Sequence, residues 1–316
     1  MLSLNFTHLK KKGSDLLSEF RSGFAAIIGR ANVGKSSLMN ALIGEKLAIV
    51  SDKPQTTRNR IQGVLTRQNY QIVFVDTPGI HKPKNKLGEH MVKTAQNALS
   101  GMEVVLFVVD IADGIGYGDH KIVEWLKDSP EPVILVANKI DIADKERANA
   151  QIEDFQRRMN FDDVIAVSAL NGTNIQTLEK KLYEYLPEGP KYYPDDMMTD
   201  QPERVILSEI IREKALHLLK EEVPHGIGVD IESIEDREGR DLTEVRASII
   251  CEKSSHKGII IGKGGKMLKA IGSLSRADME KFLGTQVYLE LFVKVKDNWR
   301  NDLRTMRELG YDIRKS

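Results

Sequence analysis

The sequence has little of what a secreted or membrane-spanning protein needs. Its 316 residues include a single cysteine, Cys251, so no disulfide can form within the chain. One thiol is typical of a reducing compartment, and Cys251 lies in the apolar run 245–251, where we expect it to fill core space. No stretch approaches the roughly eighteen apolar residues needed to span a bilayer, and no secretory signal peptide is evident. We therefore expect a cytoplasmic location.

A net charge of either sign is also lacking, because 46 Lys and Arg balance 46 Asp and Glu. The charge is nevertheless unevenly placed. Residues 251–316 hold fourteen basic and eight acidic side chains, a balance of +6, which leaves 32 and 38, a balance of −6, for residues 1–250. A basic C-terminal end indicates an anionic partner for that end. The length, with 41% hydrophobic residues, allows roughly two domains that each bury a core.

The most informative motif is the run 29–36, Gly-Arg-Ala-Asn-Val-Gly-Lys-Ser, which follows an apolar strand expected over 24–28 and opens a helix. It has the spacing of a phosphate-binding loop. Its two glycines let backbone N–H groups surround phosphate oxygens at a helix N-terminus. Lys35 can reach the β- and γ-phosphates, and the Ser36 hydroxyl can ligate Mg²⁺. The alternative is a simple glycine turn, but Lys and Ser in register favour a nucleoside triphosphate site.

The base is indicated by the run 138–141, Asn-Lys-Ile-Asp, which follows the apolar run 132–137. The Asp141 carboxylate can accept hydrogen bonds from the N1–H and the N2 amine of guanine. Adenine offers neither donor, so the pattern favours guanine. We expect Asn138 to tie this loop to the phosphate-binding loop and the Lys139 stem to lie on the purine face.

A further loop, Ser168-Ala169-Leu170, follows the apolar run 164–167. We expect the Ala169 N–H to meet the guanine carbonyl. This short signal is informative only in its order along the chain, after the phosphate-binding loop, a threonine loop, Asp-x-x-Gly and Asn-Lys-x-Asp. Five such signals in one order predict a GTPase.

The run Asp76-Thr77-Pro78-Gly79 is expected to respond to the γ-phosphate. Asp76 stands where a carboxylate behind Mg²⁺ belongs, and the Gly79 N–H can approach the γ-phosphate. Upstream, the polar loop 54–58 offers the hydroxyls of Thr56 and Thr57, of which we favour Thr57 as a Mg²⁺ ligand; the alternative is an ordinary solvated loop.

The hydrolytic machinery is less complete. Ile80 follows Gly79, where many GTPases have a glutamine that orients the attacking water. Asn32 can hold a monovalent cation such as K⁺ against the phosphates, or it can simply tolerate a left-handed backbone. Arg58 and Arg60 are conceivable arginine fingers, but we expect both to be solvated.

The predicted site therefore has three groups of residues. Nucleotide contacts are expected from Gly29, Arg30, Ala31, Asn32, Val33, Gly34, Lys35, Ser36, Ser37, Asp76, Thr77, Pro78, Gly79, Ile80, Asn138, Lys139, Ile140, Asp141, Ser168, Ala169 and Leu170. Mg²⁺ is expected at Ser36, Thr57 and Asp76, and the catalytic residues are expected to be Lys35, Thr57, Gly79 and Asn32.

Apolar strands alternate with amphipathic helices up to residue 186, which predicts an α/β fold of parallel βαβ units in a doubly wound sheet. The Pro- and Gly-rich stretch after it breaks this rhythm. We predict an N-terminal extension over 1–21, a GTPase domain over 22–186, a linker over 187–202 and a second domain over 203–316. The extension can touch a membrane surface or be disordered.

The second domain is predicted to run helix, two strands, helix, G-x-x-G, helix, strand and a last charged helix from Asp297 to about Leu309. This is the order of an α+β type II KH domain, whose G-x-x-G loop grips about four nucleotides of single-stranded RNA. The alternative is a glycine turn between helices. Exposed aromatic side chains look scarce, which favours reading of base edges over stacking. RNA contacts are expected from Ile261, Gly262, Lys263, Gly264, Gly265, Lys266 and Lys269.

Together these motifs, with the stretches 289–296 and 309–311, resemble the Era family of bacterial GTPases over nearly the whole chain except the N-terminal extension. The resemblance implies GTP hydrolysis with Mg²⁺, binding near the 3′ end of small-subunit ribosomal RNA and a part in assembly of the 30S ribosomal subunit. It also implies peripheral contact with the inner face of the cell membrane, and a hydrophobic residue at the position of Ile80. No obligate protein partner is implied, and we expect a monomer.

We therefore expect GTP to order two switch loops and to change how the KH groove is presented to RNA, with residues 76–100 as the transmitter. Two other functional classes make different predictions. A scaffold whose nucleotide only stabilises the fold would keep its RNA function after Lys35→Ala. A tRNA-modifying GTPase would carry further catalytic domains and a reactive C-terminal cysteine, and a tandem GTPase would need a second phosphate-binding loop.

Overall fold

The computed structural model describes residues 20–51, 53, 56–80 and 82–311. Nearly all of the predicted N-terminal extension therefore lies outside the described residues, as do Pro54 and Gln55 of the predicted threonine loop.

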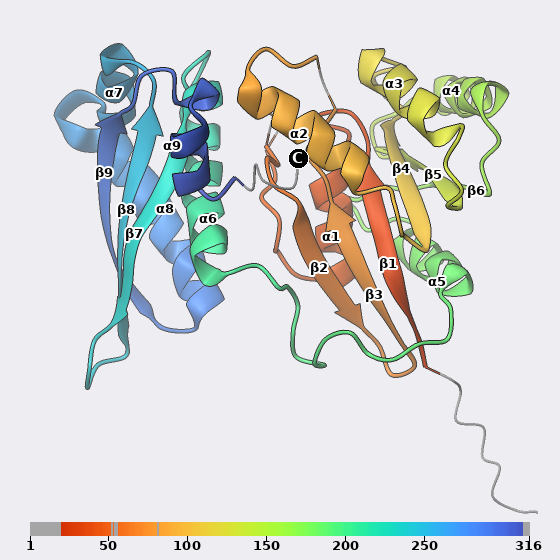
Figure 1. Ribbon diagram of the computed structural model, residues 1–316, viewed down its shortest axis with the longest axis horizontal. Coiled ribbons are helices and arrows are strands. Elements are labelled where there is room, and N and C mark those ends of the chain that lie inside the picture. The colour runs from red at the N-terminus through yellow and green to blue at the C-terminus, as the bar shows by residue number, and fades with distance from the viewer. Residues whose placement is uncertain (1–19, 52, 54–55, 81, 312–316) are drawn as a thin grey trace, which may run out of the picture.

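The first half of the chain forms a six-stranded sheet in the order β2-β3-β1-β4-β5-β6 (Figure 1). Its strands are β1 (Arg21–Ile28), β2 (Ile61–Thr66), β3 (Tyr70–Asp76), β4 (Val104–Asp110), β5 (Val133–Asn138) and β6 (Asp163–Ala166). The doubly wound α/β prediction is confirmed, with one difference: β2 pairs antiparallel with β3. Only three residues join these two strands, which is enough for a hairpin but too short for a parallel crossover.

Helices cover both faces of this sheet. The helices are α1 (Lys35–Ile43), α2 (Lys86–Asn97), α3 (Tyr117–Leu126), α4 (Lys145–Arg158) and α5 (Ile175–Tyr185). Side chains of α1 and α5 share a core with one face, and those of α2, α3 and α4 share a core with the other. The central strand β4 is buried along its whole length because both faces are covered. Its carboxyl end, with those of β1, β3 and β5, forms the edge where loops meet.

The stretch predicted as a linker runs along the sheet and is tied to it (Figure 1). Gln71 of β3 is fully buried and its Oε1 accepts from the N–H groups of Tyr192 (2.8 Å) and Tyr193 (3.0 Å). Near the end of the stretch, the Thr199 hydroxyl donates to the Gln62 carbonyl at 2.6 Å. Prolines and a glycine end the helix before it, as expected, but the segment is a strap held by hydrogen bonds.

The second half folds as predicted into a KH domain. It comprises α6 (Glu203–Leu218), the 3₁₀ turn η1 (Pro224–Gly226), β7 (Gly228–Asp236), β8 (Leu242–Cys251), α7 (Ser254–Ile261), the 3₁₀ turn η2 (Lys263–Gly265), α8 (Lys266–Leu283) and β9 (Gln286–Val295). β8 pairs antiparallel with β7 and parallel with β9. The helices α6, α7 and α8 bury one face of this sheet, and Cys251 is buried in that core as expected.

The prediction of one helix from Asp297 to about Leu309 is wrong. The chain instead forms a 3₁₀ turn, η3 (Trp299–Asn301), and a short helix, α9 (Leu303–Glu308). Asn298 before the turn has a left-handed backbone (φ 51°), and extended Asp302 caps α9 by accepting from the Thr305 N–H at 3.0 Å. The break lets Trp299 be fully buried, with its Nε1 donating to the Gly226 carbonyl at 2.9 Å.

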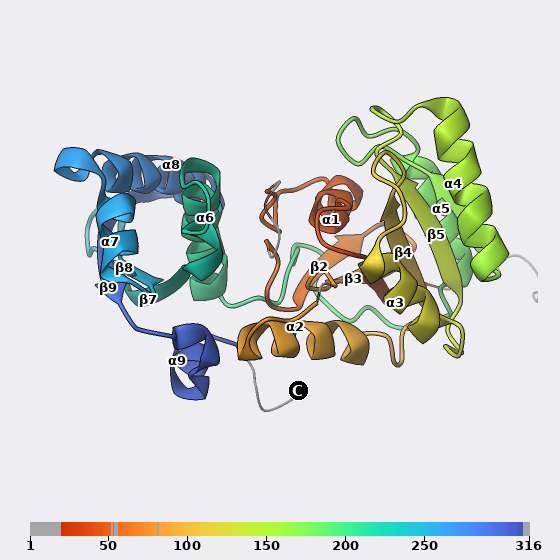
Figure 2. The same cartoon turned by 90° about the horizontal axis from the view of Figure 1, so that it is seen from above.

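The two halves meet along α6 and the C-terminal segment (Figures 1 and 2). Seen from above, α9 lies beside one end of α2. Leu87 and Met91 of α2 form one buried cluster with Trp299, Met306 and Tyr311. The helix that follows Asp-x-x-Gly is therefore packed directly on the KH half.

We expect Gln71→Ala to lower the free energy of unfolding by about 2–3 kcal/mol, because it leaves two partly buried N–H groups of the strap without an acceptor. Urea denaturation followed by circular dichroism measures this change. Gln68→Ala, at an exposed position of the neighbouring turn, is the control and should be neutral. An unchanged midpoint for Gln71→Ala would show that the strap contributes nothing to stability.

Candidate nucleotide site and RNA groove

The phosphate-binding loop has the geometry that its sequence predicts. Gly34 has φ 97°, and a Cβ there would lie 2.3 Å from the Asn138 side-chain nitrogen. Lys35 begins α1 and is 6% exposed, and its Nζ donates to the carbonyls of Gly29 (3.2 Å) and Arg30 (3.0 Å). Burial lowers the pKa of Lys35 to about 8, against the opposing pull of nearby carboxylates, of which Asp76 is the strongest. The loop thus folds its only ammonium group inward, toward the phosphate position.

Three oxygen-bearing side chains converge beside this loop. The Ser36 hydroxyl lies 2.8 Å from the Thr57 hydroxyl and donates to Asp76 Oδ2 at 2.7 Å, and Thr57 donates to the same oxygen at 3.4 Å. Burial raises the pKa of Asp76, and its Oδ1 has no hydrogen-bond partner in the described part of the chain. Hydroxyl and carboxylate oxygens with an unsatisfied buried acceptor fit a Mg²⁺ site. Thr56 instead donates to the Lys53 carbonyl at 2.6 Å, which supports the choice of Thr57.

The loop after β5 is tied to its neighbours as expected. The Asn138 side chain donates to the Val33 carbonyl at 2.8 Å, which joins this loop to the phosphate-binding loop. Asp141 accepts from the Ser168 hydroxyl at 2.7 Å and is thereby oriented. The Ala169 N–H donates to Asn138 Oδ1 at 3.0 Å, so its contact with a guanine carbonyl stays a prediction.

The ammonium of Lys139 pairs with Asp110 Oδ2 at 2.6 Å, and Lys139 has a left-handed backbone (φ 69°). Asp110 was not predicted as a site residue. Its position at the carboxyl end of β4, a parallel strand of a doubly wound sheet, is the signal that could have found it.

These loops enclose a cavity of about 640 Å³. Its walls include most of the predicted nucleotide residues and add six that were missed: Ile49, Val50, Ser51, Asp110, Asp113 and Ile142. Eight predicted contacts do not line it: Gly29, Val33, Asp76, Thr77, Pro78, Ile80, Ile140 and Ser168. Val33 and Ile80 are buried in the two sheet cores, and the Thr77 hydroxyl donates to the Ile27 carbonyl at 2.9 Å. Several of the eight thus support the wall from behind.

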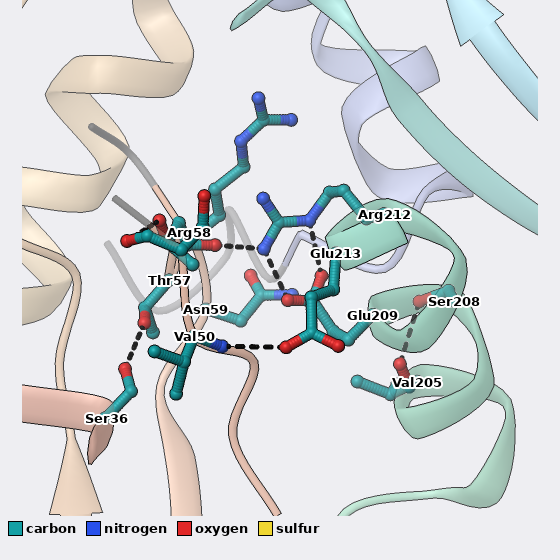
Figure 3. Close-up of polar contacts among 12 residues, drawn as sticks. Ser36, Val50, Thr57, Arg58, Asn59, Val205, Ser208, Glu209, Arg212 and Glu213 are labelled. Carbon is teal, nitrogen blue, oxygen red and sulfur yellow. Dashed lines mark hydrogen bonds and ion pairs between the residues drawn. The ribbon is translucent and has the colours of Figure 1, made fainter. Parts of the chain in front are cut away.

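Arg58 departs most from expectation. It was predicted to be solvated, but its side chain is 1% exposed and points away from the nucleotide cavity into the KH half (Figure 3). Arg60 is exposed, as expected. Neither arginine lines the nucleotide cavity.

The predicted RNA-binding loop lies between α7 and α8. Gly262, Gly264 and Gly265 all have positive φ values (72°, 60° and 76°), which only glycine adopts without strain. A groove of about 440 Å³ begins at this loop. It is lined by Gly265, Leu268, Lys269, Gly272, Ser273 and Arg276 of the loop and α8, and by Val287, Tyr288, Leu289 and Leu291 of β9.

Of the other predicted RNA residues, Lys263 and Lys266 are exposed beside the groove, and Ile261 packs on the KH core. The expectation of few exposed aromatics is wrong, because Tyr288 and Phe292 of β9 are 52% and 47% exposed. They alternate with buried Val287 and Val293, so they occupy the outward face of the strand.

Comparisons with known proteins agree with this division. A family model described as 50S ribosome-binding GTPase matches residues 24–139, and a KH domain model matches residues 222–300. GTPase Era of Alkaliphilus oremlandii is 56% identical over 293 residues, which cover 93% of this chain and 99% of that protein. The chain belongs to the Era family of GTPases.

Other members of the Era family match a similar share of the chain. GTPase Era of Clostridioides difficile is 54% identical over 294 residues, covering 93% of this chain and 99% of that protein. A crystal structure of an Aquifex aeolicus Era variant bound to GDP·AlF4⁻ superposes with a TM-score of 0.88 at 40% identity, covering 92% of this chain and 99% of that one. A structure of Era in complex with MgGDPNP and nucleotides 1506–1542 of 16S ribosomal RNA superposes with a TM-score of 0.89 at 41% identity, covering 92% of this chain and 99% of that one.

We expect Gly34→Ala to weaken GDP and GTP binding by at least about tenfold, since the added methyl strains a left-handed backbone and displaces the Asn138 amide. Gly44→Ala is the matched control, because Gly44 also has a positive φ (88°) but nothing lies near its Cβ position. It should lower thermal stability and leave nucleotide affinity unchanged. Fluorescence titration with a labelled nucleotide measures the affinity of each variant. Equal affinities for the two variants would contradict the assignment of residues 29–36 as the phosphate-binding loop.

Proposed function

We propose that this chain is a GTP-hydrolysing switch that binds single-stranded small-subunit ribosomal RNA near its 3′ end and acts in assembly of the 30S subunit. The GTPase and KH domains of the Era family support it, as does the crystal structure of Era with MgGDPNP and 16S ribosomal RNA nucleotides. The observation that carries the switch is that α2 and the Thr57 loop both contact the C-terminal segment 299–311.

Each part of the nucleotide site has a proposed role. Lys35 and the N–H groups of the phosphate-binding loop bind the phosphates, and Asp141, oriented by Ser168, selects guanine. Ser36 and Thr57 would hold Mg²⁺, with Asp76 behind them, and a bound ion would supply positive charge beside the phosphate oxygens. Buried Ile80 cannot orient a water molecule, so we assign that task to backbone groups around Gly79, which lies against Ala31 of the phosphate-binding loop.

The KH groove is proposed to hold the RNA. The three glycines of the loop let a sugar-phosphate chain approach the backbone, and Lys263, Lys266 and Lys269 supply positive charge. The edge strand β9 forms the other wall, and the exposed Tyr288 ring on the outward face of this strand is proposed to stack on a base that passes over its edge.

The coupling between the two sites is proposed to run through α2. This helix follows the Gly79 turn, and its Leu87 and Met91 pack on Trp299 and Tyr311 of the KH half. A change at Gly79 that moves α2 must therefore repack this cluster. Residues 76–100, predicted as the transmitter, contain this helix.

We expect the affinity for a single-stranded oligonucleotide of the ribosomal 3′ end to differ by more than about twofold between the GTP-analogue and GDP states, since a ligand shifts an equilibrium only by its differential affinity. The double variant Lys263→Asp, Gly264→Asp should lose RNA binding in both states. Lys281→Asp, an exposed charge reversal near the far end of α8, is the control. Fluorescence anisotropy measures the RNA affinity of the unchanged protein, the double variant and the control. Equal affinities of the unchanged protein in the two nucleotide states would rule out gating of RNA binding by the nucleotide.

A requirement for K⁺ is a further part of the proposal. Asn32 has a left-handed backbone (φ 65°) in the wall of the nucleotide cavity, so both of its possible roles remain open: a cation ligand or a residue that suits the turn. Glycine adopts the same backbone without a side-chain oxygen, so Asn32→Gly separates the two roles.

We expect GTP turnover to be faster in K⁺ than in Na⁺ at equal ionic strength, and Asn32→Gly to lose that difference while it keeps GDP affinity. Release of inorganic phosphate measures the rates. Equal rates in the two salts would remove Asn32 from the catalytic residues.

The proposed partners are the small-subunit ribosomal RNA and the 30S subunit, and the proposed location is the cytoplasm with peripheral contact at the cell membrane. None of the helices in the described part of the chain is long and apolar enough to cross a membrane.

A further inference from the structure

The loop that carries Thr57 is held mainly by the KH half of the protein. Glu213 of α6 accepts from the Val50 N–H at 3.1 Å, and its other oxygen pairs with Lys46 at 2.7 Å. Arg212, also of α6 and 1% exposed, donates to the Thr56 carbonyl (Figure 3). The two ends of the loop are thus fixed to neighbouring residues of one helix in the other domain.

Arg58 is the deepest of these attachments. Its Nη1 donates to the Ile227 carbonyl at 2.6 Å and to the Tyr311 hydroxyl at 3.3 Å, and its Nη2 donates to the His225 carbonyl at 3.1 Å. The guanidinium also lies 5.8 Å from the centre of the Trp299 ring. Every group in this socket belongs to the KH half, and all three acceptors are neutral.

Thr57 and Arg58 are consecutive, and both are buried, but in opposite directions (Figure 3). Thr57 contacts Ser36 and Asp76 of the GTPase half, whereas Arg58 enters the KH half. Because the two residues share a peptide bond, seating Arg58 in its socket also restricts where the Thr57 hydroxyl can lie.

We propose that Arg58 is a positioning residue for GTP hydrolysis: seated in the KH domain, it holds the Thr57 hydroxyl at the Mg²⁺ site formed with Ser36 and Asp76. The KH domain is then part of the hydrolytic site, in addition to its proposed role in RNA binding. This inference concerns turnover without RNA, so it stands whether or not RNA affinity depends on the nucleotide.

The socket suits only an arginine. A buried cation is costly unless its donors find partners. Here Nη1 and Nη2 reach three acceptors and the guanidinium lies against the Trp299 ring, while Nε has no partner in the described part of the chain. Lysine has the same charge but a single nitrogen, so it cannot span the His225 and Ile227 carbonyls and the Tyr311 hydroxyl in this geometry. Because the guanidinium is committed to these contacts, it does not serve as an arginine finger in this arrangement.

The test compares full-length variants in GTP turnover without RNA. Arg58→Lys should lower kcat by about tenfold, since it loses hydrogen bonds of a charged group, and should raise the Mg²⁺ concentration needed for half-maximal rate. GDP affinity should stay within about twofold of the wild-type value, because Arg58 does not line the nucleotide cavity. Two controls should match the wild type: Arg60→Lys, exposed on the same segment, and Ser208→Ala, which removes a hydrogen bond within α6 only.

A double variant decides whether Arg58 acts through Thr57. If it does, Thr57→Ala with Arg58→Lys should turn over no more slowly than Thr57→Ala alone. If the kcat losses of the two single variants multiply in the double variant, the proposal is overturned. A wild-type kcat for Arg58→Lys would overturn it as well. A loss of GDP affinity or of thermal stability in proportion to kcat would also overturn it, because it would show general damage to the fold.

Discussion

The nucleotide site depends on how closely the backbone of the phosphate-binding loop is approached by its neighbours. A Cβ at Gly34 would lie 2.3 Å from the Asn138 amide, and a Cβ at Gly79 would lie 2.7 Å from the Ala31 Cα. Distances this short leave no space for any side chain, so the loops that follow β1, β3 and β5 are locked together at a single edge of the sheet. At the same edge Lys35 is buried and the hydroxyls of Ser36 and Thr57 converge on Asp76.

Much of this site could be predicted from the sequence because each motif is local. Residues 29–36 carry their own backbone requirement, and residues 138–141 follow an apolar strand whose end must lie at the same edge. What could not be predicted depends on contacts between distant segments. The burial of Arg58 needs carbonyl groups from residues 225 and 227 and a hydroxyl from residue 311, and no local pattern around Arg58 reveals them.

The same distinction, between local motifs and contacts of distant segments, explains where the predictions for the KH half were wrong. The run after Asp297 has helical composition, but Trp299 gains more by entering the space near Gly226 than by continuing a helix, and the chain breaks on both sides of it. On β9, alternation would have identified Tyr288 and Phe292 as outward-facing, because buried Val287 precedes the first and buried Val293 follows the second. The expectation that exposed aromatic side chains are scarce does not take that alternation into account. The glycine loop and its element order are present as predicted, and Gly265 and Lys269 line the groove, whereas RNA binding there stays a prediction.

The strap along the GTPase sheet limits how far apart the two halves can move. Thr199 is hydrogen-bonded to Gln62 of that sheet, and α6 begins at Glu203. Four peptide steps, fully extended, reach about 14 Å. The KH half can consequently rotate about the start of α6, but it cannot move to a distant surface unless the GTPase half moves with it.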